Sequence, residues 1–413
     1  IYDLLALRWT HRYYSAADFE MLAPHLAPEG LRGGFRYGDA QTDDARLVLR
    51  LIQEAVEDGG VAVNYVRVCG LVQEGGRVVG VRLREEGSGR EAEVRARVVI
   101  NATGAWADRL RTEVGAPPRM RPLRGSHLIF PAWRLPVAQA VGFLHPADRR
   151  PVFVFPWEGI TLVGTTDLDH DRPLDEEPAI SPEEVDYLLE AVRSEFPALG
   201  LEPRDVIATF AGVRPVVGSE RVDPSRESRD HVIWEEGGLL TVTGGKLTTF
   251  RLIALDALQA VRSHLPGLKA PSRRTPVLNP VDLPLPEGVR LDEALWRRLL
   301  GRYGSKAPAV VAAARPDELA PIPGVPTLWA ELRWAARAEA VEHLDDLLLR
   351  RVRLGLLLPE GGRQLLPAIR DIVLPELGWD EARWEAEVCA YLSLWRRAYY
   401  LPERLVEAGA AAS

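Results

Sequence analysis

A proline-rich stretch at residues 265–290 divides the chain into two parts of different character. Before it, short runs rich in β-branched residues alternate with polar turns. After it, residues 291–405 have helical apolar spacing almost throughout and hold six of the eleven tryptophans. Because prolines at this density interrupt both helices and sheets, we interpret residues 271–290 as a linker. The 413 residues are enough for two or three domains, each with its own core.

The segment before the linker begins with one well-specified helix. Asp43 or Asp44 can cap it, and Gly59-Gly60 ends it. Its predicted apolar face consists of Leu47, Val48, Leu51, Ile52, Ala55 and Val56. Strands are predicted at residues 61–68, 71–73, 77–84 and 94–100. The last of these leads into Asn101-Ala102-Thr103-Gly104, which is typical of the end of a buried parallel strand.

Strands also dominate the middle of the chain. We predict them at residues 126–130, 152–156, 160–165, 206–213, 231–235 and 239–243, with one helix at 182–195 and another from near Lys246 to about His264. The predicted class is therefore mixed α/β (α+β), with an antiparallel sheet and a separate C-terminal all-α domain.

Charge and cysteine content exclude several classes of protein. A formal net charge of −8 argues against a broad nucleic-acid surface. Two distant cysteines, Cys69 and Cys389, indicate a reducing compartment rather than a disulfide framework. No leader-like segment and no apolar run near 18 residues occurs, so we expect a cytoplasmic protein, at most peripheral on the inner face of the membrane.

Two glycine-rich segments fail as nucleotide-binding loops. The run from Gly87 to Ala92 fits G-x-G-x-x-A, but it joins two strands and opens no helix, so we interpret it as a hairpin loop. Gly245-Lys246 fails as a P-loop because Leu247 replaces the required serine or threonine.

The run from Thr243 to Arg251 is more informative, because it follows a strand and starts a helix. Gly244 and Gly245 let a flat ligand approach the backbone, and the free N–H groups at a helix start favour negative charge. With Lys246, such a turn would stabilise a reduced flavin. A plain glycine turn before a capped helix explains the same residues.

Three further basic side chains belong to the same β-rich region. Arg214 follows an apolar strand, Arg229 precedes the next strand, and His127 stands where an apolar strand begins. Each alone is explained by an ordinary paired arginine or a hydrogen-bonded histidine. Together with Lys246 they are predicted at strand ends, where open sheets gather their ligands.

Seven motifs occur in an order that resembles FAD-dependent glycerol-3-phosphate dehydrogenases. They are the run from Tyr37 to Leu47, Asn101-Ala102-Thr103-Gly104, Arg124-Gly125-Ser126-His127, Gly164-Thr165-Thr166-Asp167, Gly212-Val213-Arg214-Pro215, Ser228-Arg229-Asp230 and Gly244-Gly245-Lys246-Leu247-Thr248-Thr249. The helical tail, with Leu344 to Arg351 and Arg353-Leu354-Gly355, is similar to the family's C-terminal domain. Phe250 stands where the family pattern leads us to expect tyrosine, a conservative difference.

The resemblance implies oxidation of sn-glycerol 3-phosphate to dihydroxyacetone phosphate, with electrons passing through FAD to a quinone. His127 would be the base and Arg214 would stabilise the developing oxyanion. Arg229 and Lys246 would hold the phosphate, and Thr166 would line the pocket. The resemblance implies no metal, and a homodimer is left open.

The same resemblance implies FAD contacts and domain limits. Val68, Ala102, Thr103, Gly104, Gly244, Gly245, Lys246, Leu247 and Thr248 would contact FAD. The remaining part of an FAD-binding Rossmann-like domain would span residues 1–110, with a return at 206–270. The substrate-binding sheet domain would span 111–205, and the helical domain 291–413.

No G-x-G-x-x-G strand–turn–helix unit occurs within the 413 residues, although the resemblance implies one before Ile1. We therefore expect weak or no FAD binding and little activity from the chain alone. Three alternatives stay open: an oxidase that passes electrons to oxygen, an amine-oxidising flavoprotein, and a non-catalytic binding protein. The set of cations disfavours the second, because an amino-acid substrate needs only one carboxylate clamp.

Overall fold

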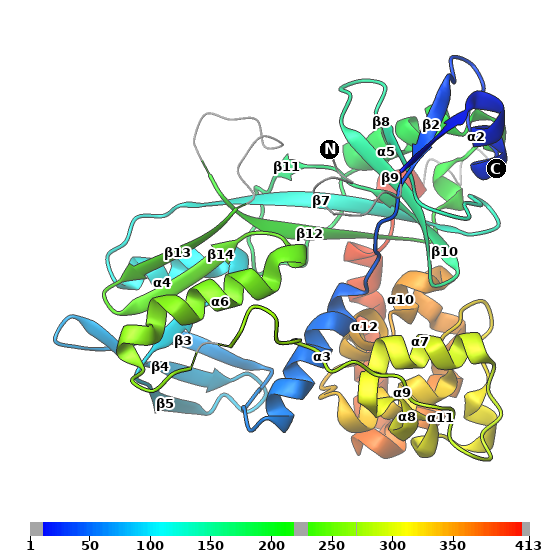
Figure 1. Cartoon of the computed structure of the whole chain (residues 1–413). Coiled ribbons are helices and arrows are strands. Elements are labelled where there is room, and N and C mark those ends of the chain that lie inside the picture. The colour runs from blue at the N-terminus through cyan, green and yellow to red at the C-terminus, as the bar shows by residue number, and fades with distance from the viewer. Residues whose placement is uncertain (1–10, 219–229, 270, 407–413) are drawn as a thin grey trace.

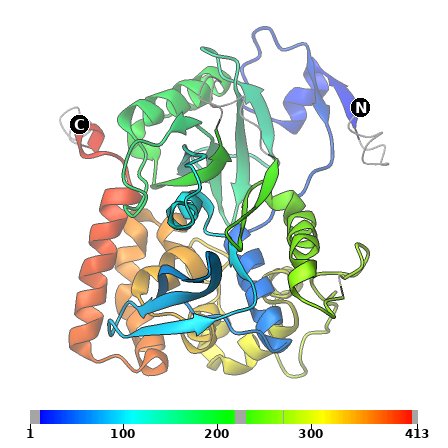
Figure 2. The same ribbon diagram turned by 90° about the vertical axis from the view of Figure 1, so that its left-hand side faces the viewer.

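The computed structural model describes residues 11–218, 230–269 and 271–406. A long central sheet lies above two smaller three-stranded sheets and a C-terminal helical domain in both views (Figures 1 and 2). The central sheet has the strand order β11-β7-β10-β9-β8, with β12 on the other edge of β7, and all its pairs are antiparallel. Its strands are β7 (Met120–Pro131), β8 (Val141–Leu144), β9 (Pro151–Trp157), β10 (Ile160–Gly164), β11 (Leu168–Asp169) and β12 (Ala208–Val217).

The two faces of this sheet are covered by different helices, because alternate residues point to opposite sides. Helix α5 (Pro182–Glu195) lies on one face (Figure 1), where Leu128, Val163 and Leu188 share a buried core. The C-terminal helices α10 (Leu354–Leu357) and α12 (Glu381–Ala398) lie on the other side of the sheet, where Ile129 and Leu162 join the core of the helical domain. Helix α5 starts at Ser181 with a full capping box, as an S-x-x-E sequence predicts.

The described residues also form two smaller three-stranded sheets. In the first, β14 (Leu239–Gly244) pairs with β13 (His231–Glu236) and runs parallel to β6 (Val99–Asn101). Helix α6 (Phe250–Ala260) packs on β13 and β14, and α4 (Ala107–Glu113) packs on β14. The second sheet has the order β3 (Val66–Glu74), β4 (Arg77–Glu85), β5 (Glu91–Arg95). The run from Gly87 to Ala92 connects β4 to β5, as the hairpin interpretation predicted.

The C-terminal part is helical, as the apolar spacing predicted. It contains α7 (Glu293–Tyr303), α8 (Ala307–Ala313), α9 (Trp329–Ala338), a π-helical turn (Asp346–Arg351), α10 (Leu354–Leu357), α11 (Leu366–Leu377) and α12 (Glu381–Ala398). Leu347, Leu354 and Ile369 are among the side chains at its centre that are inaccessible to solvent. Packing on the central sheet adds strand residues to the same core, which holds the two parts together.

The N-terminal segment contains β1 (Arg12–Ser15), α2 (Ala16–Leu22), β2 (Gly33–Arg36) and α3 (Asp44–Glu57). Asp43 caps α3, but the helix does not bury the predicted apolar face. Val48, Ile52 and Val56 are each more than two-fifths exposed, whereas Arg46 is buried. Helix α3 instead turns its arginine side to the helical domain, where carboxylates neutralise the charge.

Several predicted strand limits were wrong. The strand expected at residues 61–68 begins only at Val66, because no described strand pairs with the residues before it, and it continues through the stretch predicted as a separate strand at 71–73. The strand expected at 94–100 is divided into β5 and β6. Strand β8 was not predicted. The domain limits remain a proposal, and the pairing of β12 along β7 favours assigning residues up to Val217 to the substrate sheet.

Candidate active site

His127 and Arg214 lie on the same face of the central sheet. His127 on β7 is opposite Phe210 on β12, and Gly125 is opposite Gly212, two residues before Arg214. Because the side-chain period of a strand is two, all five residues face the same side. This differs from the prediction that His127 and Arg214 stand at strand ends: both lie within long strands, since β7 and β12 extend beyond their apolar runs.

Two glycines on this face make room for the two functional side chains. A Cβ atom at Gly164 would lie 2.1 Å from Cδ2 of His127, and one at Gly125 would lie 2.2 Å from a terminal nitrogen of Arg214. Such distances are far below van der Waals contact. The imidazole and the guanidinium therefore lie directly over glycine backbone, which only a residue without a side chain permits.

The environment of His127 keeps the imidazole neutral. Its ring stacks on Phe210 with centroids 4.4 Å apart, and its Nδ1 is buried without a hydrogen-bond partner among the described residues. Burial, followed by the positive charge of Arg214, lowers the pKa of His127 to about 3. A neutral imidazole at neutral pH can accept a proton, which a base requires.

Arg214 is held by three consecutive residues after β10. One terminal nitrogen donates to Oδ1 of Asp167 at 3.1 Å and to the backbone oxygen of Thr166 at 3.5 Å. The other donates to the hydroxyl of Thr165 at 3.2 Å. The side chain of Arg214 remains 30% exposed, so part of it is accessible from outside the sheet.

Most of the predicted FAD contacts lie where the parallel strands β6 and β14 end. Asn101 closes β6 and binds both the hydroxyl of Thr241 on β14, at 3.2 Å, and the backbone oxygen of Ala107, at 2.9 Å. These contacts place the predicted set from Ala102 to Gly104 beside the end of β14, which itself lies against β12. The region outside the carboxyl ends of parallel strands is where open α/β sheets bind ligands.

The residues at these strand ends fit a large nucleotide cofactor. Gly104, Gly244 and Gly245 have positive φ, and a Cβ atom at Gly104 would meet nothing within 4 Å. Ala102, Thr103, Lys246, Leu247 and Thr248 are exposed, with Leu247 41% accessible. A surface with open backbone, an apolar side chain and one ammonium group suits a flat, anionic ligand. Val68 on β3 is 37% exposed, and its predicted contact with adenine stays a prediction.

Three residues were predicted to bind the substrate, Arg229 and Lys246 at its phosphate and Thr166 in the lining of the pocket. Arg229 lies outside the described residues, so its role stays a prediction. Lys246 is exposed at the start of a 3₁₀ turn that leads into α6. Thr166 is 4% exposed, and its hydroxyl donates to the carboxylate of Glu184 at 2.6 Å. Glu184 was not predicted, because its contacts with the Gly-Thr-Thr-Asp turn carry no sequence signal.

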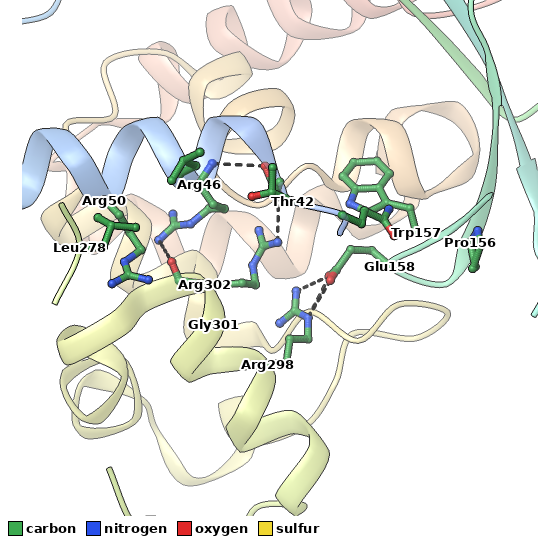
Figure 3. Close-up of a pocket in the computed structure, with 13 residues that line it drawn as sticks. Thr42, Arg46, Arg50, Pro156, Trp157, Glu158, Leu278, Arg298, Gly301 and Arg302 are labelled. Atoms are coloured by element: carbon green, nitrogen blue, oxygen red, sulfur yellow. Dashed lines mark hydrogen bonds and ion pairs between the residues drawn. The ribbon is translucent and has the colours of Figure 1, made fainter. Parts of the chain in front are cut away.

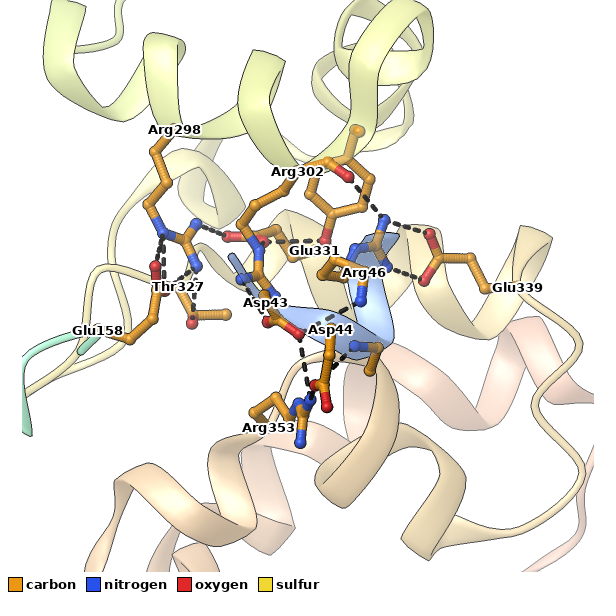
Figure 4. A network of polar contacts seen from close by, with 12 residues as sticks. Asp43, Asp44, Arg46, Glu158, Arg298, Arg302, Thr327, Glu331, Glu339 and Arg353 are labelled. Atoms are coloured by element: carbon orange, nitrogen blue, oxygen red, sulfur yellow. Dashed lines mark hydrogen bonds and ion pairs between the residues drawn. The ribbon is translucent and has the colours of Figure 1, made fainter. Parts of the chain in front are cut away.

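A cavity of about 430 Å³ lies elsewhere, between α3, α7 and the turn after β9 (Figure 3). Its arginines already have carboxylate partners. Arg46 binds Glu339 at 2.7 Å, and Arg302 binds Asp43 at 2.9 Å. Figure 4 shows that these pairs form one network joining α3 to the helical domain. The network neutralises its own charge, so we interpret the cavity as part of a structural junction.

No helix within residues 11–218, 230–269 and 271–406 is both long enough and apolar enough to span a bilayer. Among these same residues, no group of three or more histidine, cysteine or acidic side chains is arranged to hold a metal ion.

Comparison with family models first defines the class of protein. Residues 2–251 match the family described as FAD dependent oxidoreductase, and residues 270–384 match the C-terminal domain of alpha-glycerophosphate oxidase. The crystal structure of the glycerol-3-phosphate dehydrogenase from Bacillus halodurans, complexed with FAD, superimposes with a TM-score of 0.76 at 26% identity. The match covers 94% of this chain and 82% of that one.

Sequence relatives narrow the class. Glycerol-3-phosphate dehydrogenase 2 of Mycobacterium tuberculosis (strain ATCC 25618 / H37Rv) is 34% identical over 402 residues, 92% of this chain and 67% of the relative. Aerobic glycerol-3-phosphate dehydrogenase of Bacillus subtilis (strain 168) is 38% identical over 271 residues, 64% of this chain and 48% of the relative. The chain thus spans about two thirds of the mycobacterial relative. It belongs to the FAD-dependent glycerol-3-phosphate dehydrogenase family.

Proposed function

We propose that the chain oxidises sn-glycerol 3-phosphate to dihydroxyacetone phosphate with FAD as its cofactor, and that the electrons pass on to a quinone. Family membership supports the reaction. The observation that carries the assignment of residues is the pair His127 and Arg214, which share one sheet face beside the strand ends that fit FAD.

His127 would receive the proton of the carbon-2 hydroxyl. Its Nδ1 is buried, which leaves Nε2 as the nitrogen for the substrate. A base works best when its pKa is close to the working pH, and a pKa of about 3 is low for this task. The phosphate of the substrate, nearly a dianion, would offset the charge of Arg214 and so raise the pKa of His127 when substrate binds.

The cations of the site would bind and orient the substrate. Lys246 and Arg229 would hold the phosphate, for which ammonium and guanidinium groups are suitable partners. Arg214 would donate to the oxygen on carbon 2 and stabilise the negative charge that develops there. FAD, when bound, supplies the acceptor for the hydride from carbon 2. The residues Ala102 to Gly104 and Gly244 to Thr248 would hold it.

A steady-state assay with FAD in excess and a soluble quinone tests these roles. We expect His127→Asn and Arg214→Met each to lower kcat/KM for glycerol 3-phosphate by at least 100-fold, within the range for a general base or an oxyanion-stabilising donor. Arg109→Met serves as a control, because Arg109 pairs with Asp175 and is half exposed. Variants that fold and keep the kcat/KM of the wild type would contradict the assignment.

The electron acceptor has a second candidate, because the C-terminal match is to a domain of alpha-glycerophosphate oxidase. Measuring product formation with quinone and with oxygen separates the two. A dehydrogenase reacts rapidly only with the quinone, whereas peroxide formed at the same rate without quinone would show an oxidase.

Peripheral membrane contact belongs to the same proposal. The arginines near the π-helical turn give it no support, because they bind internal partners. Arg350 contacts Asp345 at 2.5 Å, Arg351 donates to the backbone oxygen of Glu339, and Arg353 contacts Asp43. Co-sedimentation of the full chain with anionic liposomes tests the contact, and protein left in the supernatant would contradict it.

A further inference from the structure

We call the face of the central sheet that carries His127 and Arg214 its front face, and the opposite face its back. A glutamate on the back contacts the two segments that carry or bind these residues. Glu184, in the first turn of α5, is 1% exposed. Helix α5 packs against β7 and β10 from the face opposite His127 and Arg214. Burying a carboxylate costs free energy unless hydrogen bonds or ion pairs compensate the charge. The groups that bind Glu184 are therefore held in place by it.

The two carboxylate oxygens of Glu184 bind different partners. Oε2 accepts from the guanidinium of Arg124 at 2.9 Å and from the backbone N–H of Ser181 at 2.9 Å. These contacts neutralise a buried arginine and cap the helix, and both are structural. Oε1 accepts from the hydroxyls of Ser126, at 2.8 Å, and Thr166, at 2.6 Å. Those two residues belong to β7 and to the turn after β10.

The two residues that bind Oε1 are connected to the functional side chains on the front face. Ser126 precedes His127 in the chain, and its backbone N–H donates to the hydroxyl of Thr166 at 2.9 Å. Thr166 is the middle one of the three residues that bind the guanidinium of Arg214. The guanidinium in turn lies over Gly125. A displacement of the Thr166 backbone therefore moves these three acceptors of Arg214 together.

We propose that Glu184 is a positioning residue for the proposed site: by holding Ser126 and Thr166 from behind the sheet, it fixes Arg214 beside His127. The effect of Glu184 on catalysis rests on the proposed function. Its effect on the position of Arg214 does not, because it follows from the contacts within this chain. The guanidinium of Arg214 donates to Thr165, Thr166 and Asp167 on the turn after β10, so a shift of that turn changes its position.

Thr166→Val is the sharpest test, because it removes the hydroxyl but keeps the ion pair of Glu184 with Arg124 and the cap of α5. Thr166→Ser keeps the hydroxyl and should restore wild-type behaviour. Glu184→Gln removes the charge itself. Glu183→Gln is the matched control, since Glu183 is the preceding residue of α5, is largely exposed and pairs only with Arg404 among its described ion pairs.

The first readout is the titration of the His127 ring, followed by NMR in protein without substrate. Arg214 helps to keep the pKa of His127 low. Release of Arg214 in Thr166→Val and Glu184→Gln should therefore move the titration toward higher pH, whereas Thr166→Ser and Glu183→Gln should match the wild type. Because no substrate is present, a direct contact between Thr166 and substrate cannot produce this shift.

The second readout is kcat/KM for glycerol 3-phosphate with FAD in excess, which we expect to fall at least tenfold in Thr166→Val and to recover in Thr166→Ser. An unchanged His127 titration in folded Thr166→Val would overturn the inference, even if Glu184→Gln fails to fold. If the wild type does not oxidise glycerol 3-phosphate, the proposed function fails, but the His127 titration still decides whether Glu184 positions Arg214.

Discussion

Replacing Gly164 with alanine tests the central feature of the site, the close approach of His127 to glycine backbone. The new Cβ atom would lie 2.1 Å from Cδ2 of His127, whereas ordinary contact begins at 3.4 Å. The ring must therefore retreat by about 1.3 Å, the difference between the two distances. Phe210 already stacks on the ring with centroids 4.4 Å apart, so the retreat also disturbs the sheet face.

Misplacing a reacting group by about 1 Å costs roughly 100-fold in rate, which corresponds to about 2.7 kcal/mol in activation free energy. The free energy of unfolding should fall by about 1–3 kcal/mol, as for other overpacked positions. We would measure kcat/KM with FAD in excess, and the unfolding free energy from urea titrations.

Gly301→Ala is the matched control, because a Cβ atom at this helical position meets nothing within 4 Å. It should leave kcat/KM unchanged and keep or raise the unfolding free energy, since alanine favours helix. A folded Gly164→Ala protein whose kcat/KM lies within twofold of the wild type would refute the proposed position of His127.

Three further predictions concern Lys246 and the junction between α3 and the helical domain. Lys246→Ala should weaken substrate binding or slow flavin reduction by more than tenfold, about 1.4 kcal/mol; unchanged kinetics would show that Lys246 does not hold the phosphate. Asp43→Asn keeps the cap of α3 but removes the charge that pairs with Arg302 and Arg353, so it should lower the unfolding free energy by about 3 kcal/mol. The control is Asp44→Asn, which should change the unfolding free energy by less than about 1 kcal/mol because Asp44 is exposed. Burial raises the pKa of Asp43, but Arg353 and Arg302 outweigh it and leave the pKa below its usual value. The stabilisation by Asp43 is thus present above an unfolded pKa of about 3.9 and is lost as the pH falls through the lower folded value. The gap between the urea midpoints of the wild type and Asp43→Asn should therefore narrow as the pH falls from neutral to about pH 3, and a constant gap would contradict this.

Local sequence signals predicted most of the elements because those elements are locally determined. The helix predicted at residues 182–195 is α5, which has the predicted limits. Asp43 capped α3 as predicted. The parallel character of the strand before Asn101 followed from its β-branched run and is confirmed by its pairing with β14.

The remaining features depend on contacts between distant segments. The sequence of α3 predicted a buried apolar face, yet Arg46 is the side chain that is buried, because Glu339 lies 293 residues away and neutralises it. The roles of Gly125 and Gly164 follow from strand register, which pairs β7 with β12 and β10 and which a single sequence does not specify. Glu184 was missed for the same reason, since only the packing of α5 against β7 brings it to Thr166.

The most direct test of the proposed reaction is a single turnover without oxygen. The purified chain is mixed with FAD in excess, so that weak binding does not hide the reaction, and sn-glycerol 3-phosphate is added anaerobically. Our account predicts bleaching of the flavin absorbance, with one dihydroxyacetone phosphate formed per flavin reduced, and no bleaching with glycerol. A bound flavin that stays oxidised in the presence of saturating glycerol 3-phosphate would contradict it.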